Sequence, residues 1–234
     1  MPQCDPGMSP DRASAPLGSR TGGPREHVNG WFHAVGALLA AVALLVLTRE
    51  AHERGSLRHL IGAAAFGGTA VLMFSASALY HLRRGSPRQR LYQRLDHAMI
   101  YLFIAGSYTP VCLVALWPSV FGLALLAVVW TIAAVGVALD LRRRPLGRGA
   151  ATALYLGLGW AALPIAPVLA ASHPGLGAWL LVGGAFYTVG ALLYWRRRPR
   201  RRIGVVGHHE LWHLCVIAAS ASHFWAIRTY VLTL

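Results

Sequence analysis

Long runs without charged residues alternate along the chain with short segments rich in arginine. Each run has about 17–22 residues, and a helix that rises 1.5 Å per residue needs roughly 20 residues to cross a hydrocarbon core of about 30 Å. The seven runs cover Gly30–Leu47, Leu60–Tyr80, Ala98–Leu116, Val120–Leu139, Ala150–Ala171, Leu176–Trp195 and Leu211–Ile227. The pattern predicts an all-α membrane domain of seven transmembrane helices over residues 26–234.

The first 25 residues follow a different pattern. They are rich in proline, glycine and serine and contain no apolar run. Such a segment cannot bury enough apolar surface to offset the entropy lost on folding, so we expect a disordered tail. Pro110, Pro164 and Pro167 fall inside the predicted spans, and membrane helices tolerate proline where neighbouring helices satisfy the freed carbonyls.

Composition supports a membrane protein. Hydrophobic residues make up 56% of the chain and charged residues only 13%, whereas a soluble domain has about a quarter of its residues charged. Charge is missing over long runs rather than spread over a surface, which favours a membrane protein over a soluble one.

The net charge of +14 suggests nucleic-acid binding until the basic residues are placed. All 22 of them are arginines, and if the seven runs are spans, only Arg49, Arg54, Arg58 and Arg228 fall on one side of the membrane. The other arginines lie in the tail and in the three loops on the opposite side. Basic loops stay in the cytoplasm, so the N-terminus is predicted inside and the C-terminus outside. We interpret the arginines as topology signals that contact anionic lipid headgroups, and expect no nucleic-acid partner.

Several polar residues fall at the ends of spans, where their burial is costly and points to function. His81 ends the second span, Asp96 begins the third, and His209 and His213 begin the seventh. Under the predicted topology these four residues lie at one depth, near the cytoplasmic border. Each has a simpler explanation alone, as an interfacial histidine, a helix N-terminal acid or a chance H-x-x-x-H. Their common depth favours a metal site.

The spacing of these residues indicates the chemistry. His209 and His213 are four residues apart, so they share one face of a helix and can bind one metal ion. His81 can add a third imidazole, and three protein ligands with one open position are typical of catalytic zinc. Asp96 is expected to face a cation, the metal or a water on the metal. Ser77 lies four residues before His81 on the same face and can hydrogen-bond to Asp96, water or substrate.

The stretch "HELWH" at 209–213 also matches the H-E-x-x-H pattern of zinc proteases, in which the glutamate activates water. A protease would need a third ligand further along the chain. His223 is the only later histidine, and ten residues of helix place it about 15 Å deeper. We therefore interpret Glu210 as a helix-start acid or an arginine partner and keep an intramembrane protease as an alternative. His208 is a spare ligand candidate, and His97 is taken as structural.

An ordered set of motifs resembles a known family. Glu26-x-x-Asn29-x-x-x-His33 leads into the first span, Ser77-x-x-x-His81 ends the second, Asp96 begins the third and His209-x-x-x-His213 begins the seventh. Over about residues 25–230 this set resembles the hemolysin III family, the bacterial branch of the progestin and adiponectin receptor group. It is also similar to the alkaline ceramidases.

The resemblance implies one zinc ion held by His81, His209 and His213, with Asp96 contacting a water on the metal rather than the metal itself. It also implies a cytoplasmic N-terminus and a multi-pass protein of the bacterial inner membrane. Glu26, Asn29 and His33 either pack around the site as outer partners or simply join helices; the sequence leaves both open.

Three functions are consistent with these features. The first is a zinc-dependent hydrolase of lipid amide or ester bonds, in which zinc polarises the carbonyl and supplies hydroxide, Asp96 is the base and an acyl chain enters from the membrane. The second is a non-catalytic sensor or regulator of the membrane with a structural zinc. The third is the cytolytic activity that the family name suggests. A lipid-lined cavity beside the metal would favour the first, and a sealed metal the second.

Overall fold

The computed structural model describes residues 24–142, 146–199 and 207–234. The predicted disordered tail lies outside these residues except for Pro24 and Arg25, which begin the first helix. Proline suits this first helical position because the amide hydrogen that it lacks would have no partner there.

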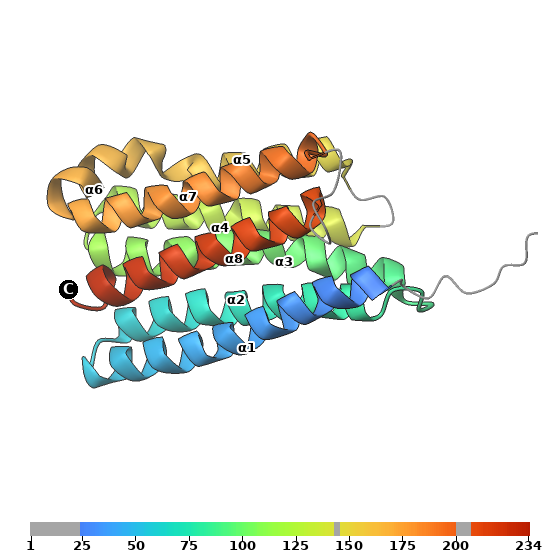
Figure 1. Cartoon of the computed structure of the whole chain (residues 1–234). Coiled ribbons are helices and arrows are strands. Elements are labelled where there is room, and N and C mark those ends of the chain that lie inside the picture. The colour runs from blue at the N-terminus through green and yellow to red at the C-terminus, as the bar shows by residue number, and fades with distance from the viewer. Residues whose placement is uncertain (1–23, 143–145, 200–206) are drawn as a thin grey trace, which may run out of the picture.

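The described chain consists of helices gathered in one bundle, in which successive spans run antiparallel to each other (Figure 1). The helices are α1 (Pro24–Glu53), α2 (Leu57–Leu82), α3 (Gln89–Pro110), η2 (Val111–Ala115), α4 (Val120–Leu141), α5 (Arg148–Gly159), η3 (Trp160–Ile165), α6 (Ala166–Ser172), α7 (Pro174–Trp195), α8 (His208–Ala226) and η4 (Ile227–Val231). The described residues contain no strand, which confirms the predicted all-α class.

Six of these segments are long and apolar enough to cross a membrane. They contain the first six predicted spans, with α5, η3 and α6 together forming the fifth and α3 with η2 the third. The seventh predicted span corresponds to α8, which is not among the six by length and composition. It starts with three polar residues, His208, His209 and Glu210, and lies beside α7 along the bundle (Figure 1).

Helices that are sequential in the chain provide most of the packing. The densest contacts join α1 to α2, α2 to α3 and α7 to α8, whereas α8 touches α1 at only a few points. Close approach of α1 and α2 depends on small residues: a Cβ atom at Gly67 would lie 2.8 Å from the backbone Cα of Leu44. Small residues at helix contacts are typical of membrane bundles, where close van der Waals packing replaces the hydrophobic effect between helices.

The fifth span is broken where its sequence contains proline. α5 gives way to the 3₁₀ turn η3, which holds Pro164, and α6 begins beside Pro167. Tyr108 of α3 stabilises the break, because its hydroxyl lies 2.7 Å from the carbonyl oxygen of Gly159 and accepts the amide of Ala162 at 3.1 Å. A neighbouring helix thus satisfies backbone groups freed by the break, as expected for proline in a membrane span.

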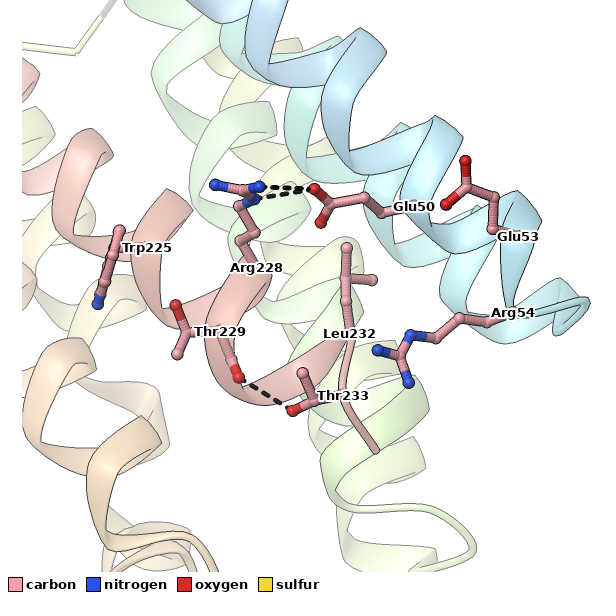
Figure 2. Close-up of a pocket in the computed structure, with 8 residues that line it drawn as sticks. All are labelled: Glu50, Glu53, Arg54, Trp225, Arg228, Thr229, Leu232 and Thr233. Carbon is pink, nitrogen blue, oxygen red and sulfur yellow. Dashed lines mark hydrogen bonds and ion pairs between the residues drawn. The ribbon is translucent and has the colours of Figure 1, made fainter.

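One end of the bundle carries the N-terminus of α1, the α2–α3 turn and the start of α8, on the right in Figure 1. At the opposite end, Arg228 of η4 pairs with Glu50 of α1 at 2.9 Å (Figure 2). This ion pair is one of the few links between α1 and the last helix, and both partners are partly exposed to solvent. Glu53 and Arg54 line a surface pocket at this end together with the paired Glu50 and Arg228 (Figure 2).

The arginine distribution predicts which end faces the cytoplasm. Reporter fusions after residue 20 and within the Arg196–Arg202 loop are expected to report a cytoplasmic location, and a fusion at Leu234 an external one. A cytoplasmic reading at Leu234 would contradict a seventh span and the common depth of the histidines. Alkaline phosphatase and green fluorescent protein fusions at the same positions provide the paired measurement, because each is active on only one side.

Candidate metal centre

Three helices bring the predicted polar residues to one end of the bundle. His81 lies in the last turn of α2, Asp96 two turns after the start of α3, and His209 and His213 in the first two turns of α8. The fold achieves this because α2 and α8 run in opposite directions, so the end of one meets the start of the other (Figure 1). Sequence-distant histidines are therefore neighbours in space.

The start of α8 is fixed by Glu210. The amide of Gly207, which precedes the helix, donates a hydrogen bond of 2.8 Å to the Glu210 carboxylate. The carboxylate is buried and turned back toward the helix terminus, where the macrodipole favours negative charge. This geometry is that of a helix-start acid, one of the two roles that the sequence suggested for Glu210.

The three predicted ligands form a compact cluster of ring nitrogens. The Nε2 atoms of His209 and His213 are 2.9 Å apart, and those of His209 and His81 are 3.4 Å apart. One nitrogen from each ring lies within 4.8 Å of the other two. His81 and His213 are almost fully buried, with 1% and 6% of their surface exposed.

This donor set fits a metal ion. Zinc bound tetrahedrally at about 2.0–2.1 Å from each nitrogen separates its ligand nitrogens by roughly 3.3 Å, close to the two distances observed. Neutral imidazole is also a common zinc ligand. The three histidines can therefore hold a metal ion.

Asp96 and Ser77 lie beside the cluster rather than within it. Ser77, on α2 one turn before His81, is buried and lies next to the Asp96 carboxylate. The Asp96 carboxylate is not among the ligand atoms that converge with the three imidazoles. Both residues line the same cavity as His209 and His213. Such a carboxylate can accept a proton from a water or a substrate that lies between it and the imidazoles.

His33 of α1 joins the cluster as a fourth imidazole. Its ring centre is 4.0 Å from that of His213 and 6.0 Å from that of His81, and only 2% of its surface is exposed. Neither of its ring nitrogens has a hydrogen-bond partner among the described residues. The sequence left open whether His33 packs around the site or only joins helices, and the structure places it against the ligands. Glu26 and Asn29 lie on the same helix, but their side chains are outside the described part of the chain.

Other histidines do not enter the cluster. The His208 ring lies tilted against that of Tyr194, with ring centres 6.3 Å apart, and His223 lies deeper, near the carbonyl oxygen of Leu180. His97 contributes its backbone carbonyl, which accepts a hydrogen bond of 3.2 Å from Tyr155. The Tyr155 hydroxyl also lies 3.3 Å from buried Asp140, which ties the start of α3 to α4 and α5.

Sequence reasoning missed two aromatic neighbours of the cluster. The ring centre of Tyr80 is 4.9 Å from that of His81, and that of Tyr194 is 5.8 Å from that of His209. In the sequence, the only signal for Tyr80 is its position directly before His81. Tyr194 gave no signal, because tyrosine at the end of a span is normally an interfacial anchor.

A cavity of about 460 Å³ begins at the cluster and extends into the bundle. Asp96, His209 and His213 line one end of it, whereas Trp160, Tyr187 and His223 line parts further along α5–η3, α7 and α8. Its wall is otherwise mainly apolar, with Ile104, Leu163 and Val216 among the lining side chains. Mostly apolar cavities with a few convergent polar groups are typical of ligand sites.

Comparisons with known proteins agree with this architecture. The family model described as haemolysin-III related matches residues 22–224. The chain is 32% identical over 209 residues to the Hemolysin-3 protein of Bacillus cereus, an alignment that covers 88% of this chain and 92% of that protein. It is 32% identical over 207 residues to the Hemolysin-3 homolog of Bacillus subtilis (strain 168), covering 88% and 93%.

A more distant relative connects the chain to receptors. This chain is 27% identical over 223 residues to the adiponectin receptor protein of Drosophila melanogaster, an alignment that covers 85% of this chain and 49% of that protein. Together with the apolar helices, these relatives identify a multi-pass bacterial membrane protein. The chain belongs to the haemolysin-III related family, and it is related to the adiponectin receptors.

Proposed function

We propose that the protein is a zinc-dependent hydrolase that cleaves amide or ester bonds of lipids at the cytoplasmic side of the membrane. The observation that carries this proposal is the cavity, which joins two of the three convergent imidazoles, His209 and His213, and the Asp96 carboxylate to an apolar space. A structural metal that only joined helices would need no such space. An acyl chain is the ligand that a membrane-embedded apolar cavity suits best.

His81, His209 and His213 are the residues that would hold the zinc ion. Their three nitrogen donors leave one position open, as in catalytic rather than structural zinc sites. When bound, zinc acts as a Lewis acid that polarises a carbonyl group and lowers the pKa of water.

The remaining residues would serve the reaction in distinct ways. Asp96 would accept the proton of the attacking water, and the neighbouring Ser77 hydroxyl would orient the Asp96 carboxylate by donating a hydrogen bond to it. The apolar wall binds the acyl chain and excludes bulk water from the reacting carbonyl, which strengthens the electrostatic interactions there.

A structural role for the metal is the second candidate. α8 packs mainly on α7 and touches α1 sparsely, so a metal shared by α2 and α8 would join two parts of the bundle. A regulator that responds to membrane state could use such a link. The names of the two Bacillus relatives refer to haemolysis, which we rank third, because uniformly apolar helices without an amphipathic face are not typical of a pore-forming toxin.

Metal analysis and lipid turnover on the purified protein test the proposal. In nanodiscs the wild-type protein is expected to carry about one zinc ion per chain and to hydrolyse at least one member of a panel of long-chain acyl amides and esters. Chelation should abolish turnover, and added zinc should restore it. Zinc-loaded protein that cleaves no acyl substrate would favour the structural role.

A further inference from the structure

A second group of polar side chains lies in the apolar part of the cavity, away from the imidazoles. Tyr187 and Thr188 of α7, His223 of α8 and Trp160 of η3 all line this part. Polar groups at such depth in a membrane bundle are costly to bury and either join helices or serve a ligand. The donors and acceptors that helix joining leaves unused indicate which kind of ligand group this part of the cavity suits.

The hydroxyl of Tyr187 has accepting capacity and no free proton. Ser220 donates its hydroxyl proton to the carbonyl oxygen of Val216 at 2.8 Å. The contact of 3.1 Å between the Tyr187 and Ser220 hydroxyls therefore has Tyr187 as the donor. A phenolic oxygen that has donated its proton still accepts hydrogen bonds.

The neighbouring donors are occupied in the same way. Trp160 donates its indole N–H to the Thr188 hydroxyl at 2.9 Å, and Thr188 donates to the carbonyl oxygen of Gly184 at 2.7 Å. The Nε2 atom of His223 faces the carbonyl oxygen of Leu180 at 3.4 Å. This part of the cavity thus offers acceptors and lacks a spare donor among these side chains, so it suits a ligand group that donates.

The position of Tyr187 sets where that donor must lie. Ser220 is seven residues after His213, two turns along the same face of α8, which corresponds to about 10 Å. An extended acyl chain advances about 1.2 Å per bond. Roughly eight bonds of the ligand therefore separate the level of the Tyr187 hydroxyl from the imidazoles.

We propose that the cavity is selective for acyl chains that carry a hydroxyl group near the middle of the chain, and that Tyr187 accepts the hydrogen bond from this hydroxyl. The proposal rests on the hydrolase function, since it names the acyl class that the same site would take. Binding can be measured without turnover, however, so the two can fail separately.

Competition against a fluorescent fatty acid tests the proposal on the full-length protein in nanodiscs. The probes are octadecanoic acids with a hydroxyl near the tenth carbon, a ketone at the same carbon, or a hydroxyl at the chain terminus. Wild-type protein is expected to bind the mid-chain hydroxy acid about fivefold to tenfold more tightly than the other two, the effect of one net hydrogen bond. Equal affinity for all three would overturn the proposal.

Two variants separate recognition from helix joining. Tyr187→Phe should abolish the preference for the mid-chain hydroxyl, whereas Tyr230→Phe, outside the cavity lining, should keep it. Ser220→Ala removes the acceptor of the Tyr187 proton, so Tyr187 can donate and the keto acid should gain affinity to match the hydroxy acid. A preference that persists in Tyr187→Phe, or a keto acid that gains nothing in Ser220→Ala, would contradict the assignment even if one variant fails to fold.

Turnover distinguishes this proposal from the general function. Selective binding without hydrolysis of any acyl amide or ester would count against the hydrolase and leave the hydroxyl site standing. Hydrolysis of plain and hydroxylated chains at the same rate, with equal affinities, would support the hydrolase and refute the hydroxyl site.

Discussion

Replacing His213 with alanine is expected to remove most of the bound zinc. His213 supplies a ring nitrogen 2.9 Å from that of His209 and is almost fully buried within the cluster. Loss of a direct ligand should weaken zinc binding by more than the roughly 10–100-fold that removal of an outer hydrogen-bond partner costs. His81→Ala and His209→Ala should behave alike. Zinc content per chain after purification, measured by mass spectrometry, is the readout.

Matched histidine variants control for general damage to the bundle. His208→Ala lies next to a proposed ligand and His97→Ala next to Asp96, yet neither ring belongs to the converging set. Both proteins should keep about one zinc ion per chain. If His213→Ala retained its zinc while His208→Ala lost it, α8 would have to be rotated relative to our structure and the proposed ligand set would be wrong.

His33→Ala probes the buried imidazole beside the ligands and should have a smaller effect. Its ring contacts His213 edge to face but is not one of the three converging donors. Removal of an outer residue that holds a ligand ring in place typically lowers metal affinity by about 10–100-fold. The His33→Ala protein should therefore keep its zinc through purification but lose it when a weak chelator is added.

The membrane architecture could be predicted from sequence because the bilayer imposes a length and an apolar composition on each span. The fifth span shows the limit of that reasoning. Pro164 and Pro167 were expected to be tolerated inside this span, but the 3₁₀ break that contains Pro164 is stabilised by Tyr108, which comes from a different helix. Residues that are distant in the sequence determine such local structure only after the helices have packed.

The histidine cluster was accessible to sequence reasoning for two reasons. The i, i+4 spacing fixes His209 and His213 on one face of α8, and the alternation of spans brings the end of α2 to the same level. The contact between His33 and His213 was not predictable, because it depends on how α1 is rotated against α8. The hydrogen bonds of Tyr155 to Asp140 and to the His97 carbonyl depend in the same way on the packing of three helices.

Asp96→Asn is expected to separate catalysis from metal binding. Asparagine keeps the size of the side chain and can still hydrogen-bond to Ser77, but it cannot accept a proton. Since Asp96 lies outside the three converging donors, the variant should keep most of its zinc. It should lose lipid hydrolysis by roughly 10²–10⁴-fold, the usual contribution of a general base. Zinc content and turnover of the acyl panel are measured on the same preparation.

Glu210→Gln is the matched control, because a zinc protease would depend on that residue instead. Glu210 accepts the amide of Gly207 at the start of α8, and the carbonyl oxygen of glutamine can accept the same hydrogen bond. Turnover should therefore change little. If Asp96→Asn lost zinc and thermal stability together, Asp96 would only balance the charge of the metal and the structural role would gain support. If Glu210→Gln lost activity while Asp96→Asn kept it, Glu210 would be the base, and the protease interpretation of the H-E-x-x-H stretch would return.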